Sequence, residues 1–323
     1  MSERKTSILA LSALLVSIGS AQLRAAGASP GDSKADPRSV IAASHRKSDD
    51  DLKNSVMSPF TAVGAHYLEP GKPARVGADA KGVTFDPEPV KSITGSLSYE
   101  DGAFWITPVK GAGAPTVRAA TENGELKPGD SKSVTERTKL GDGEVLALDR
   151  FLVELSPQSG MGRALVHDPD SPARKAFTGL KWFTPDLDLQ VPAVFKPNPS
   201  PDKITVGTTR GLKKEFYRIG AFDFTVGGAP LRLTVLAATA APGEGDGIFI
   251  PFRDATTGKE SYDVGRYLNM TYHGPDFRYV IDFNDAGNPN CNYSPWYNCP
   301  IPPAENTLAV PIRAGEMTYP EHP

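Results

Sequence analysis

Residues 92–107 read SITGSLSYEDGAFWIT, and this stretch decides the fold class. It holds two short runs rich in β-branched and aromatic residues, 92–97 and 103–107, with turn residues between them. Such runs between turns are typical of β-strands. Comparable runs lie at residues 82–85, 145–148 and 151–155. The spacing predicts a small β-sandwich over residues 56–160.

The composition excludes several classes of protein. Among 323 residues, Gly 31 and Pro 30 make up about 19% of the chain, against about 12% on average. Because these residues interrupt long helices, bundles and coiled coils are excluded. The net charge is -3, so the chain has no basic field to hold nucleic acid. We expect a mainly β protein with few short helices.

The N-terminus predicts export. Residues 1–5 are charged, residues 8–18 are apolar, and Ala21 ends a stretch of small residues. This is the pattern of a signal peptide cleaved after Ala21, with Ala26 or Ala28 as alternatives. The apolar run is too short to span a bilayer, which needs about 20 residues. We therefore expect a periplasmic or secreted protein that does not span a membrane.

A helix is expected next to a polar leader. Residues 22–35 have the small, polar composition of a disordered segment. Residues 37–54 then follow a helical pattern, with Asp36 as the N-cap and Pro37 at the first position. We expect this amphipathic helix to pack on the segment that follows it.

The whole chain is expected to divide into a signal peptide, a leader with its helix, the sandwich and a C-terminal β domain, at residues 1–21, 22–55, 56–160 and 161–323. Ser171 before Pro172 predicts one helical turn near the start of the last part. The C-terminal domain is expected to be a larger antiparallel β structure. Its strands are predicted at residues 189–195, 203–206, 222–226, 231–236, 247–252, 277–283 and 307–312.

The only cysteines are Cys291 and Cys299. In an oxidising compartment, two cysteines this close favour one structural disulfide. Closing a nine-residue loop would stabilise the fold by about 2.5 kcal/mol. A metal pair is an alternative, although the nearest histidine in sequence is His273. A nucleophilic thiol is the other alternative, and it would need a histidine partner.

Polar residues beside aromatics gather in three loops of the C-terminal third, at residues 252–267, 281–289 and 299–306. This mixture suits planar or sugar ligands. The candidate ligand-binding or polar-cluster residues are Arg253, Asp254, Tyr262, Arg266, Tyr267, Asp282, Asn284, Trp296, Glu305 and Asn306.

These motifs carry a resemblance to a known family. They include His167 to Arg174, Gly179 to Phe183, Phe252 to Asp254 with Thr257-Gly258, Gly265 to Tyr267, Asp282 to Asn284, Asn288-Pro289, Cys299-Pro300, Pro302-Pro303, Glu305-Asn306 and Ala314 to Glu316. In them the chain resembles the bacterial domain-of-unknown-function family 1684. The resemblance runs from about residue 40 to 319 and is looser in the N-terminal half, where Val63-Gly64 and Leu68 to Gly71 match best. It implies a shared fold, and the family's name implies no activity.

No complete catalytic signature is present: the sequence has no nucleophile elbow, no His-Glu-x-x-His, no phosphate loop and no dinucleotide fingerprint. It therefore predicts no cofactor and no metal. The five histidines are scattered, which favours surface positions. Three functions stay open. The first is binding of a small molecule, glycan or envelope component by the C-terminal domain. The second is hydrolysis by a pair among Asp254, Asp282, Glu305 and Glu316. The third is a structural role in the envelope.

One spatial prediction follows from strand ends. Polar side chains at the ends of neighbouring strands come into contact, because strands lie about 4.8 Å apart. We therefore expect a single polar cluster of Arg253, Asp254, Arg266, Asp282 and Asn284. The cluster would either line a ligand cleft or lock the Cys291–Cys299 loop against the sheet.

Overall fold

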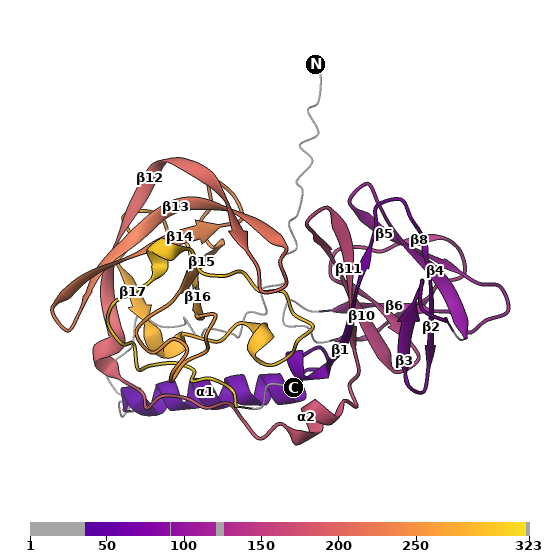
Figure 1. The fold of residues 1–323 in the computed structure, drawn as a ribbon, viewed down its shortest axis with the longest axis horizontal. Coiled ribbons are helices and arrows are strands. Elements are labelled where there is room, and N and C mark those ends of the chain that lie inside the picture. The colour runs from indigo at the N-terminus through magenta and orange to yellow at the C-terminus, as the bar shows by residue number, and fades with distance from the viewer. Residues whose placement is uncertain (1–35, 91, 121–125, 321–323) are drawn as a thin grey trace, which may run out of the picture. The chain divides into compact units, whose positions relative to one another are not determined.

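The structure is a computed structural model that describes residues 36–90, 92–120 and 126–320 (Figure 1). It is mainly antiparallel β, with 47% strand and 14% helix, which confirms the predicted fold class. The chain divides into two compact units. The N-terminal unit is His66–Ala164, and the C-terminal unit joins Leu165 onward to the described residues before His66. The predicted signal peptide and leader lie outside the described residues.

The N-terminal unit is built from two sheets, with strand orders β1-β11-β10-β9-β6-β7 and β3-β2-β4-β5-β8. A Cβ atom on Gly162 would lie 2.6 Å from Phe104 and 2.7 Å from Tyr99. Only glycine therefore permits this close approach between the sheets. The strands are β1 (Ala62–Leu68), β2 (Ala74–Asp79), β3 (Gly82–Phe85), β4 (Ile93–Glu100), β5 (Ala103–Pro108), β6 (Thr116–Ala120), β7 (Leu126–Ser133), β8 (Thr138–Lys139), β9 (Glu144–Leu148), β10 (Phe151–Gln158) and β11 (Met161–His167).

The C-terminal unit contains one six-stranded sheet, of order β16-β15-β14-β13-β12-β17. Its strands are β12 (Gln190–Gly207), β13 (Lys213–Val226), β14 (Ala229–Ala237), β15 (Gly247–Phe252), β16 (Arg266–Thr271) and β17 (Tyr279–Asp282). The core includes Phe222, Leu233, Ile250, Phe252 and Ile281, each with 0% of its surface exposed. After β17 the chain has no further strand in its described part and packs as loops and short 3-10 turns, η3 (Phe283–Asp285), η4 (Asn290–Asn292) and η5 (Ala304–Asn306).

Strand β12 changes its partner along its length. Residues 190–193 pair with β17, whereas Val194 opens the register with β13, opposite Asp223. Neighbouring strands keep their close spacing only where they are in register. The sheet therefore forks at Val194 and Asp223, and the last residues of β13 have no β12 partner beside them.

The helix α1 (Pro37–Asn54) has the predicted bounds, with the Asp36 carboxylate accepting a hydrogen bond from the Arg38 N–H. Its buried residues are Ile41, His45, Ser48 and Leu52. As expected, the helix packs on the segment that follows it, because Leu52 lies in one apolar cluster with Phe60, and its residues also group with later parts of the C-terminal unit. His45, for example, bonds to Asn284. The second helix, α2 (Pro172–Ala176), is capped by Ser171 as predicted.

One strand prediction for the C-terminal unit was wrong, and one strand was missed. Residues 307–312 form no strand; instead the Leu308 N–H donates to the Arg253 carbonyl and the Ile312 N–H donates to the Asp254 carboxylate. Strand β16 was missed, because Arg266 occupies a buried position of its alternating pattern and interrupts the apolar signal. Predicted strands 189–195 and 203–206 are parts of the single strand β12. Among the residues described, no helix has the length and apolar character needed to cross a bilayer.

Candidate functional site

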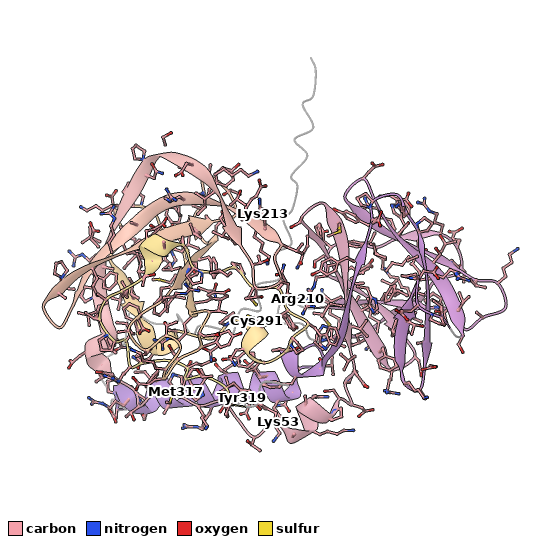
Figure 2. All side chains as sticks on the ribbon, in the orientation of Figure 1. Lys53, Arg210, Lys213, Cys291, Met317 and Tyr319 are labelled. Atoms are coloured by element: carbon pink, nitrogen blue, oxygen red, sulfur yellow. The ribbon has the colours of Figure 1, made fainter. Side chains whose placement is uncertain are left out.

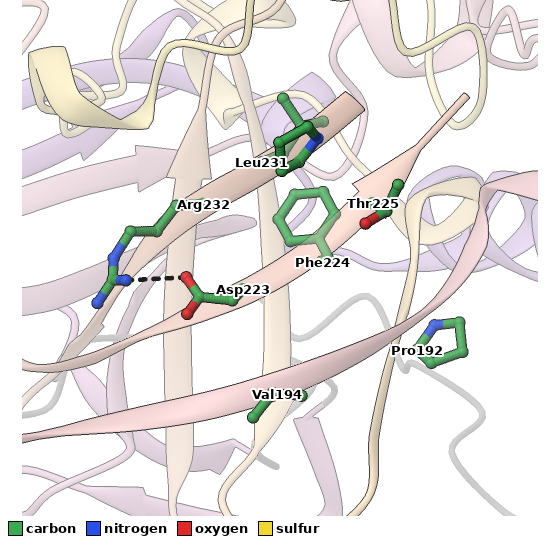
Figure 3. Close-up of a pocket in the computed structure, with 8 residues that line it drawn as sticks. Pro192, Val194, Asp223, Phe224, Thr225, Leu231 and Arg232 are labelled. Carbon is green, nitrogen blue, oxygen red and sulfur yellow. Dashed lines mark hydrogen bonds and ion pairs between the residues drawn. The ribbon is translucent and has the colours of Figure 1, made fainter. Parts of the chain in front are cut away.

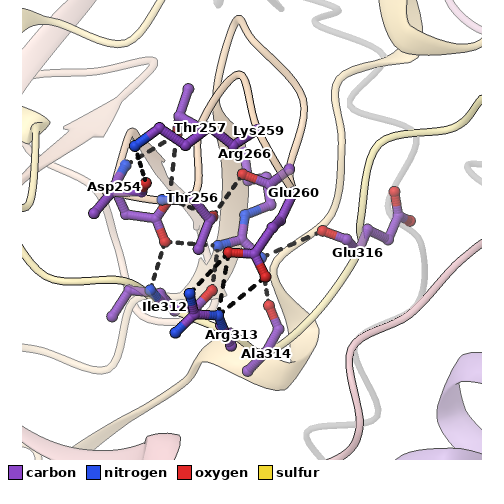
Figure 4. Close-up of polar contacts among 12 residues, drawn as sticks. Asp254, Thr256, Thr257, Lys259, Glu260, Arg266, Ile312, Arg313, Ala314 and Glu316 are labelled. Carbon is purple, nitrogen blue, oxygen red and sulfur yellow. Dashed lines mark hydrogen bonds and ion pairs between the residues drawn. The ribbon is translucent and has the colours of Figure 1, made fainter.

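The most deeply buried ion pair joins Arg266 of β16 to Asp254, which follows β15. Their side chains are 1% and 0% exposed, and Arg266 Nη2 lies 3.0 Å from Asp254 Oδ2 (Figure 4). Arg266 also donates to the carbonyl oxygens of Ile312 at 2.7 Å and of Ala314. Asp254 accepts hydrogen bonds from the Ile312 N–H and from the Thr256 hydroxyl, both at 2.7 Å. Strand ends thus bring this pair together as predicted, and the pair holds the 312–316 segment on the sheet.

Asp282 and Asn284 form a second network. The Asn284 N–H and Nδ2 donate to Asp282 Oδ1 at 2.9 and 2.8 Å, and Gln190 Nε2 donates to Asp282 Oδ2 at 2.6 Å. Asn284 also exchanges two hydrogen bonds with the backbone of Asp186, at 2.9 and 2.8 Å. The network therefore fixes the entry to β12. One of the two roles predicted for the cluster was to lock the Cys291–Cys299 loop against the sheet, and these hydrogen bonds do not do so.

The predicted single cluster is thus corrected to two networks. In the described residues, no hydrogen bond or ion pair joins Asp282 or Asn284 to Arg266 or Asp254. Arg253 takes part in neither, because its Nε donates to the Val264 carbonyl at 3.0 Å. The segment after Asn284 does reach β16, where Gly287 and Tyr267 exchange backbone hydrogen bonds at 2.8 and 3.0 Å. The two networks stay separate because their polar side chains bond to different partners.

The Glu305-Asn306 motif separates into two roles. Asn306 is fully buried: its Oδ1 accepts the Thr234 N–H at 2.7 Å, and its Nδ2 donates to the carbonyls of Thr234 and Pro251. It therefore satisfies backbone groups between β14 and β15, as a loop asparagine was expected to do. Glu305 is exposed and lies 3.1 Å from Arg218 in an ion pair.

Glu316 is a buried acid with unusual surroundings. Its side chain is fully buried, and Oε2 accepts hydrogen bonds from the Asn288 N–H at 2.9 Å and from the Tyr293 hydroxyl. Within the described residues, neither Glu316 Oε1 nor Asn288 Oδ1 has a hydrogen-bond partner. Burial raises the pKa of Glu316 to about 7, despite the opposing effect of the Tyr293 and Asn288 hydrogen bonds. This carboxyl can therefore hold a proton at neutral pH.

Sequence reasoning missed a group of residues from α1 and the loop before β12. The His45 ring stacks on Trp182, with centroids 3.8 Å apart and an interplanar angle of 8°. Its Nε2 donates to the Asn284 carbonyl at 2.9 Å. One turn later, Asp49 accepts the Trp182 Nε1–H at 3.2 Å. Burial lowers the pKa of His45 and raises that of Asp49.

A signal for this group existed in the sequence. Ile41, His45, Ser48 and Leu52 recur at helical spacing and mark one face of α1, so His45 belonged to a buried face. Treating the histidines as scattered surface residues overlooked this periodicity. The position of Trp182, however, depends on a contact across more than 130 residues, which no local pattern indicates.

The two cysteines lie in one buried group with Tyr262. Figure 2 labels Cys291 on the C-terminal unit. Cys291 and Cys299 are both free in the structure, so the expected disulfide is not formed in it. Backbone and tyrosine hydrogen bonds already fix both segments: the Thr209 N–H donates to the Cys299 carbonyl at 3.0 Å, and the Tyr262 hydroxyl donates to the Cys291 carbonyl at 3.3 Å.

The loop aromatics do not form one binding face. Tyr262 is 9% exposed within the cysteine group. The Tyr267 hydroxyl donates to the Pro300 carbonyl, and the Tyr267 ring packs edge-on against Phe249. Tyr293 contacts Phe60 and Tyr319 in a separate aromatic group. Trp296 is half-buried in the loop between the cysteines.

A cleft lies at the fork of the sheet, where sequence reasoning placed no site. It has a volume of about 600 Å³ and is lined from β12, β13 and β14 by Pro192, Val194, Asp223, Phe224, Thr225, Pro230, Leu231 and Arg232 (Figure 3). Arg232 and Asp223 form an exposed ion pair at 2.9 Å. The other lining residues are mostly apolar, and Val194 is 55% exposed.

The surroundings of the cleft are also apolar. Val280 of β17 pairs with Pro192 and is 49% exposed. Large exposed apolar residues that gather on one face, rather than lying singly, mark binding surfaces more often than isolated ones do. The described residues contain no group of three or more His, Cys, Asp or Glu side chains placed to hold a metal ion.

Comparisons with known proteins identify the family. The family described as "Protein of unknown function (DUF1684)" matches residues 175–317. A solution NMR structure of an uncharacterised protein from Haloarcula marismortui is 33% identical, with a TM-score of 0.40, and the match covers 48% of this chain and 85% of that one. No curated protein matches the sequence.

Residues 175–317 therefore match the DUF1684 family, as the C-terminal motifs suggested. The matched region begins at residue 175, so the looser N-terminal similarity at Val63-Gly64 and Leu68 to Gly71 lies outside it. Neither the family nor the Haloarcula protein carries an assigned activity in its description.

Proposed function

We propose that this is an exported protein that binds a glycan in the cleft at the β12–β13 fork. The observation that carries the proposal is the cleft itself, a shallow and widely open depression of about 600 Å³ on the C-terminal sheet. Small-molecule sites commonly have volumes of about 300 to 1,000 Å³ and combine apolar walls with a few polar groups.

The lining suits a neutral ligand with hydroxyl groups. The Asp223–Arg232 ion pair carries no net charge, and its two side chains are 39% and 61% exposed. Its free lone pairs and N–H groups can accept and donate hydrogen bonds to hydroxyls. Pro192, Val194 and Leu231 offer an apolar surface for the C–H face of a sugar ring. A saccharide of the cell envelope combines both features.

Export rests on the sequence of residues 1–21, whose charged start, apolar run and small-residue end form a signal peptide. We expect the mature protein to begin after residue 20 and to lie in the periplasm or outside the cell. N-terminal sequencing of protein from fractionated cells measures this. Recovery of an intact Met1 on cytosolic protein alone would show that the chain is not exported.

Calorimetric titration with the trimer of N-acetylglucosamine tests the binding site. We expect saturable binding to the wild type and an affinity at least about tenfold lower for Asp223→Asn, because a charge-assisted hydrogen bond contributes about 1.5 kcal/mol or more. Asp202→Asn is the matched control, since Asp202 forms an exposed ion pair with Arg218 on the same sheet, at 3.3 Å. Absence of binding to the wild type, or equal loss in both variants, would contradict the proposal.

A structural role is the second candidate, and a specific observation favours it. Arg266, Asp254, Asn284 and Asn306 use their hydrogen bonds on backbone groups and on one another. The hydrolase alternative has less support. Asp254 and Glu305 are held in ion pairs with arginines, and Asp282 accepts three hydrogen bonds from neighbouring side-chain and backbone groups.

A further inference from the structure

The two cysteines of the C-terminal unit carry chemistry that the cleft does not use. Cys291 lies in η4 and is 5% exposed, and Cys299 is 6% exposed. The backbone N–H of Cys291 donates to Cys299 Sγ at 3.3 Å. The sulfur of one residue therefore lies against the other residue while both thiols are free.

The two segments are held in place independently of each other. Cys299 exchanges two hydrogen bonds with Thr209, at 3.0 and 3.1 Å, which fix it near the end of β12. Cys291 is held by the Tyr262 hydroxyl. Neither anchor involves the other cysteine, so the hydrogen bonds to Thr209 and Tyr262 do not depend on a bond between the sulfurs. Such preorganisation favours a bond that forms and breaks without rearranging the fold.

The two thiols differ in their surroundings. The Tyr262 hydroxyl lies 3.3 Å from the Cys291 carbonyl oxygen and 3.7 Å from Cys291 Sγ, so its one proton is shared between these two acceptors. Hydrogen bonds from the Cys299 thiol and from Tyr262 lower the pKa of Cys291, whereas burial raises the pKa of Cys299. A thiolate is the attacking species in disulfide exchange, so the residue that ionises more readily attacks first.

We propose that Cys291 and Cys299 form a thiol–disulfide exchange site, in which Cys291 attacks a small-molecule disulfide and Cys299 resolves the product. In the first step the Cys291 thiolate bonds to one sulfur of the disulfide, and the other sulfur leaves as a thiolate that takes up the proton lost by Cys291. In the second step Cys299 loses its proton and attacks the Cys291 sulfur, which releases the second small thiol. The two cysteines are oxidised to one disulfide, and the small disulfide is reduced to two thiols.

Oxidised glutathione is the probe that tests this order of attack. The full chain is incubated with it in native buffer, quenched with acid and weighed by mass spectrometry. The wild type is expected to lose two hydrogens without gaining glutathione. Cys299→Ser is expected to trap one glutathione on Cys291, at an initial rate at least about tenfold higher than that of Cys291→Ser. In denaturant, both variants should react at similar rates, which controls for intrinsic reactivity.

The role of Tyr262 gives a second readout. In the Cys299→Ser background, Tyr262→Phe removes a donor to the attacking sulfur, so the pH at which the rate reaches half its maximum should rise. Tyr267→Phe is the matched control, because the Tyr267 hydroxyl donates to the Pro300 carbonyl. Its pH profile should stay that of the Cys299→Ser parent.

Three results would overturn the proposal. Equal native rates for the two single-cysteine variants would remove the assigned order of attack. Uptake of two glutathiones by the wild type, with no internal disulfide, would show that the sulfurs cannot meet. No reaction of any native form, while the denatured chain reacts, would show that the pair is purely structural.

Discussion

Replacing Glu316 by glutamine should change how the stability of the protein depends on pH. The carboxyl is fully buried, and burial raises its pKa from an ordinary value of 4.5 to about 7. The folded state therefore binds a proton that the unfolded state releases as the pH rises above 4.5. The free energy of unfolding contributed by this group falls with rising pH through this window and levels off above about pH 7.

The magnitude follows from the linkage relation. A rise from 4.5 to about 7, at about 1.36 kcal/mol per pH unit, corresponds to about 3 kcal/mol. Between about pH 5 and pH 8 most of this, about 2 to 3 kcal/mol, is lost from the wild type. Glutamine keeps the shape and cannot ionise. The glutamine carbonyl oxygen can accept the hydrogen bonds that Tyr293 and Asn288 donate to Glu316. The glutamine amide group adds an N–H donor to a site where, among the described residues, Glu316 Oε1 and Asn288 Oδ1 have no hydrogen-bond partner.

Urea unfolding of wild type and Glu316→Gln at the two pH values measures the effect. The difference between the two proteins should move by about 2 to 3 kcal/mol in favour of glutamine as the pH rises, while the other titrating groups cancel in the subtraction. Glu305→Gln, at an exposed position, is the control and should show no comparable trend. A difference that stays constant with pH would refute the assignment of a buried, neutral carboxyl.

Two further substitutions test the scaffold. Asp254→Asn leaves the guanidinium of Arg266 buried without its charged partner and should lower the free energy of unfolding by about 3 to 5 kcal/mol. Asp282→Asn should lower it by less than half as much, because the partners of Asp282 are neutral. Denaturant unfolding ranks the two variants, and the reverse order would contradict the two-network description. Asn306→Ala removes the partner of three buried backbone groups and should lower the free energy of unfolding by about 3 kcal/mol. Asn198→Ala, on the exposed sheet edge, should lower it by less than about 1 kcal/mol. Equal shifts of the melting temperature in the two variants would contradict the role of Asn306.

Local signals predicted the parts of the fold that local interactions determine. The bounds of α1 follow from Asp36 and Pro37, a capping residue and a residue whose missing N–H is harmless at the first turn. The strand at 247–252 follows from its apolar run. Residues 307–312 show the same apolar character, yet Ile312 is buried as part of a loop bonded to Asp254. An apolar run shows that a segment is buried, and its hydrogen-bond partners decide whether it is a strand.

The candidate site was predictable only in part, for a related reason. Strand ends correctly placed Arg266 beside Asp254, because both residues end or begin neighbouring strands. Extending this argument to Asp282 failed, because the Asp282 carboxylate accepts its hydrogen bonds from Gln190 and Asn284. The fork depends on β12 changing its partner at Val194, and this register is set by two other strands. Nothing in the sequence of β12 itself indicates the change.

The polar residues that carry the family resemblance and the residues of the cleft have different tasks. The described chain after β17 has no strand ladder to satisfy its backbone, and buried backbone groups must find partners. Arg266, Asn306 and Asn284 supply them from side chains, each to a segment distant in sequence. Substitutions there should therefore change stability first. Asp223, Val194 and Arg232 lie on a surface that no described segment covers, so substitutions there should change binding while leaving the fold intact.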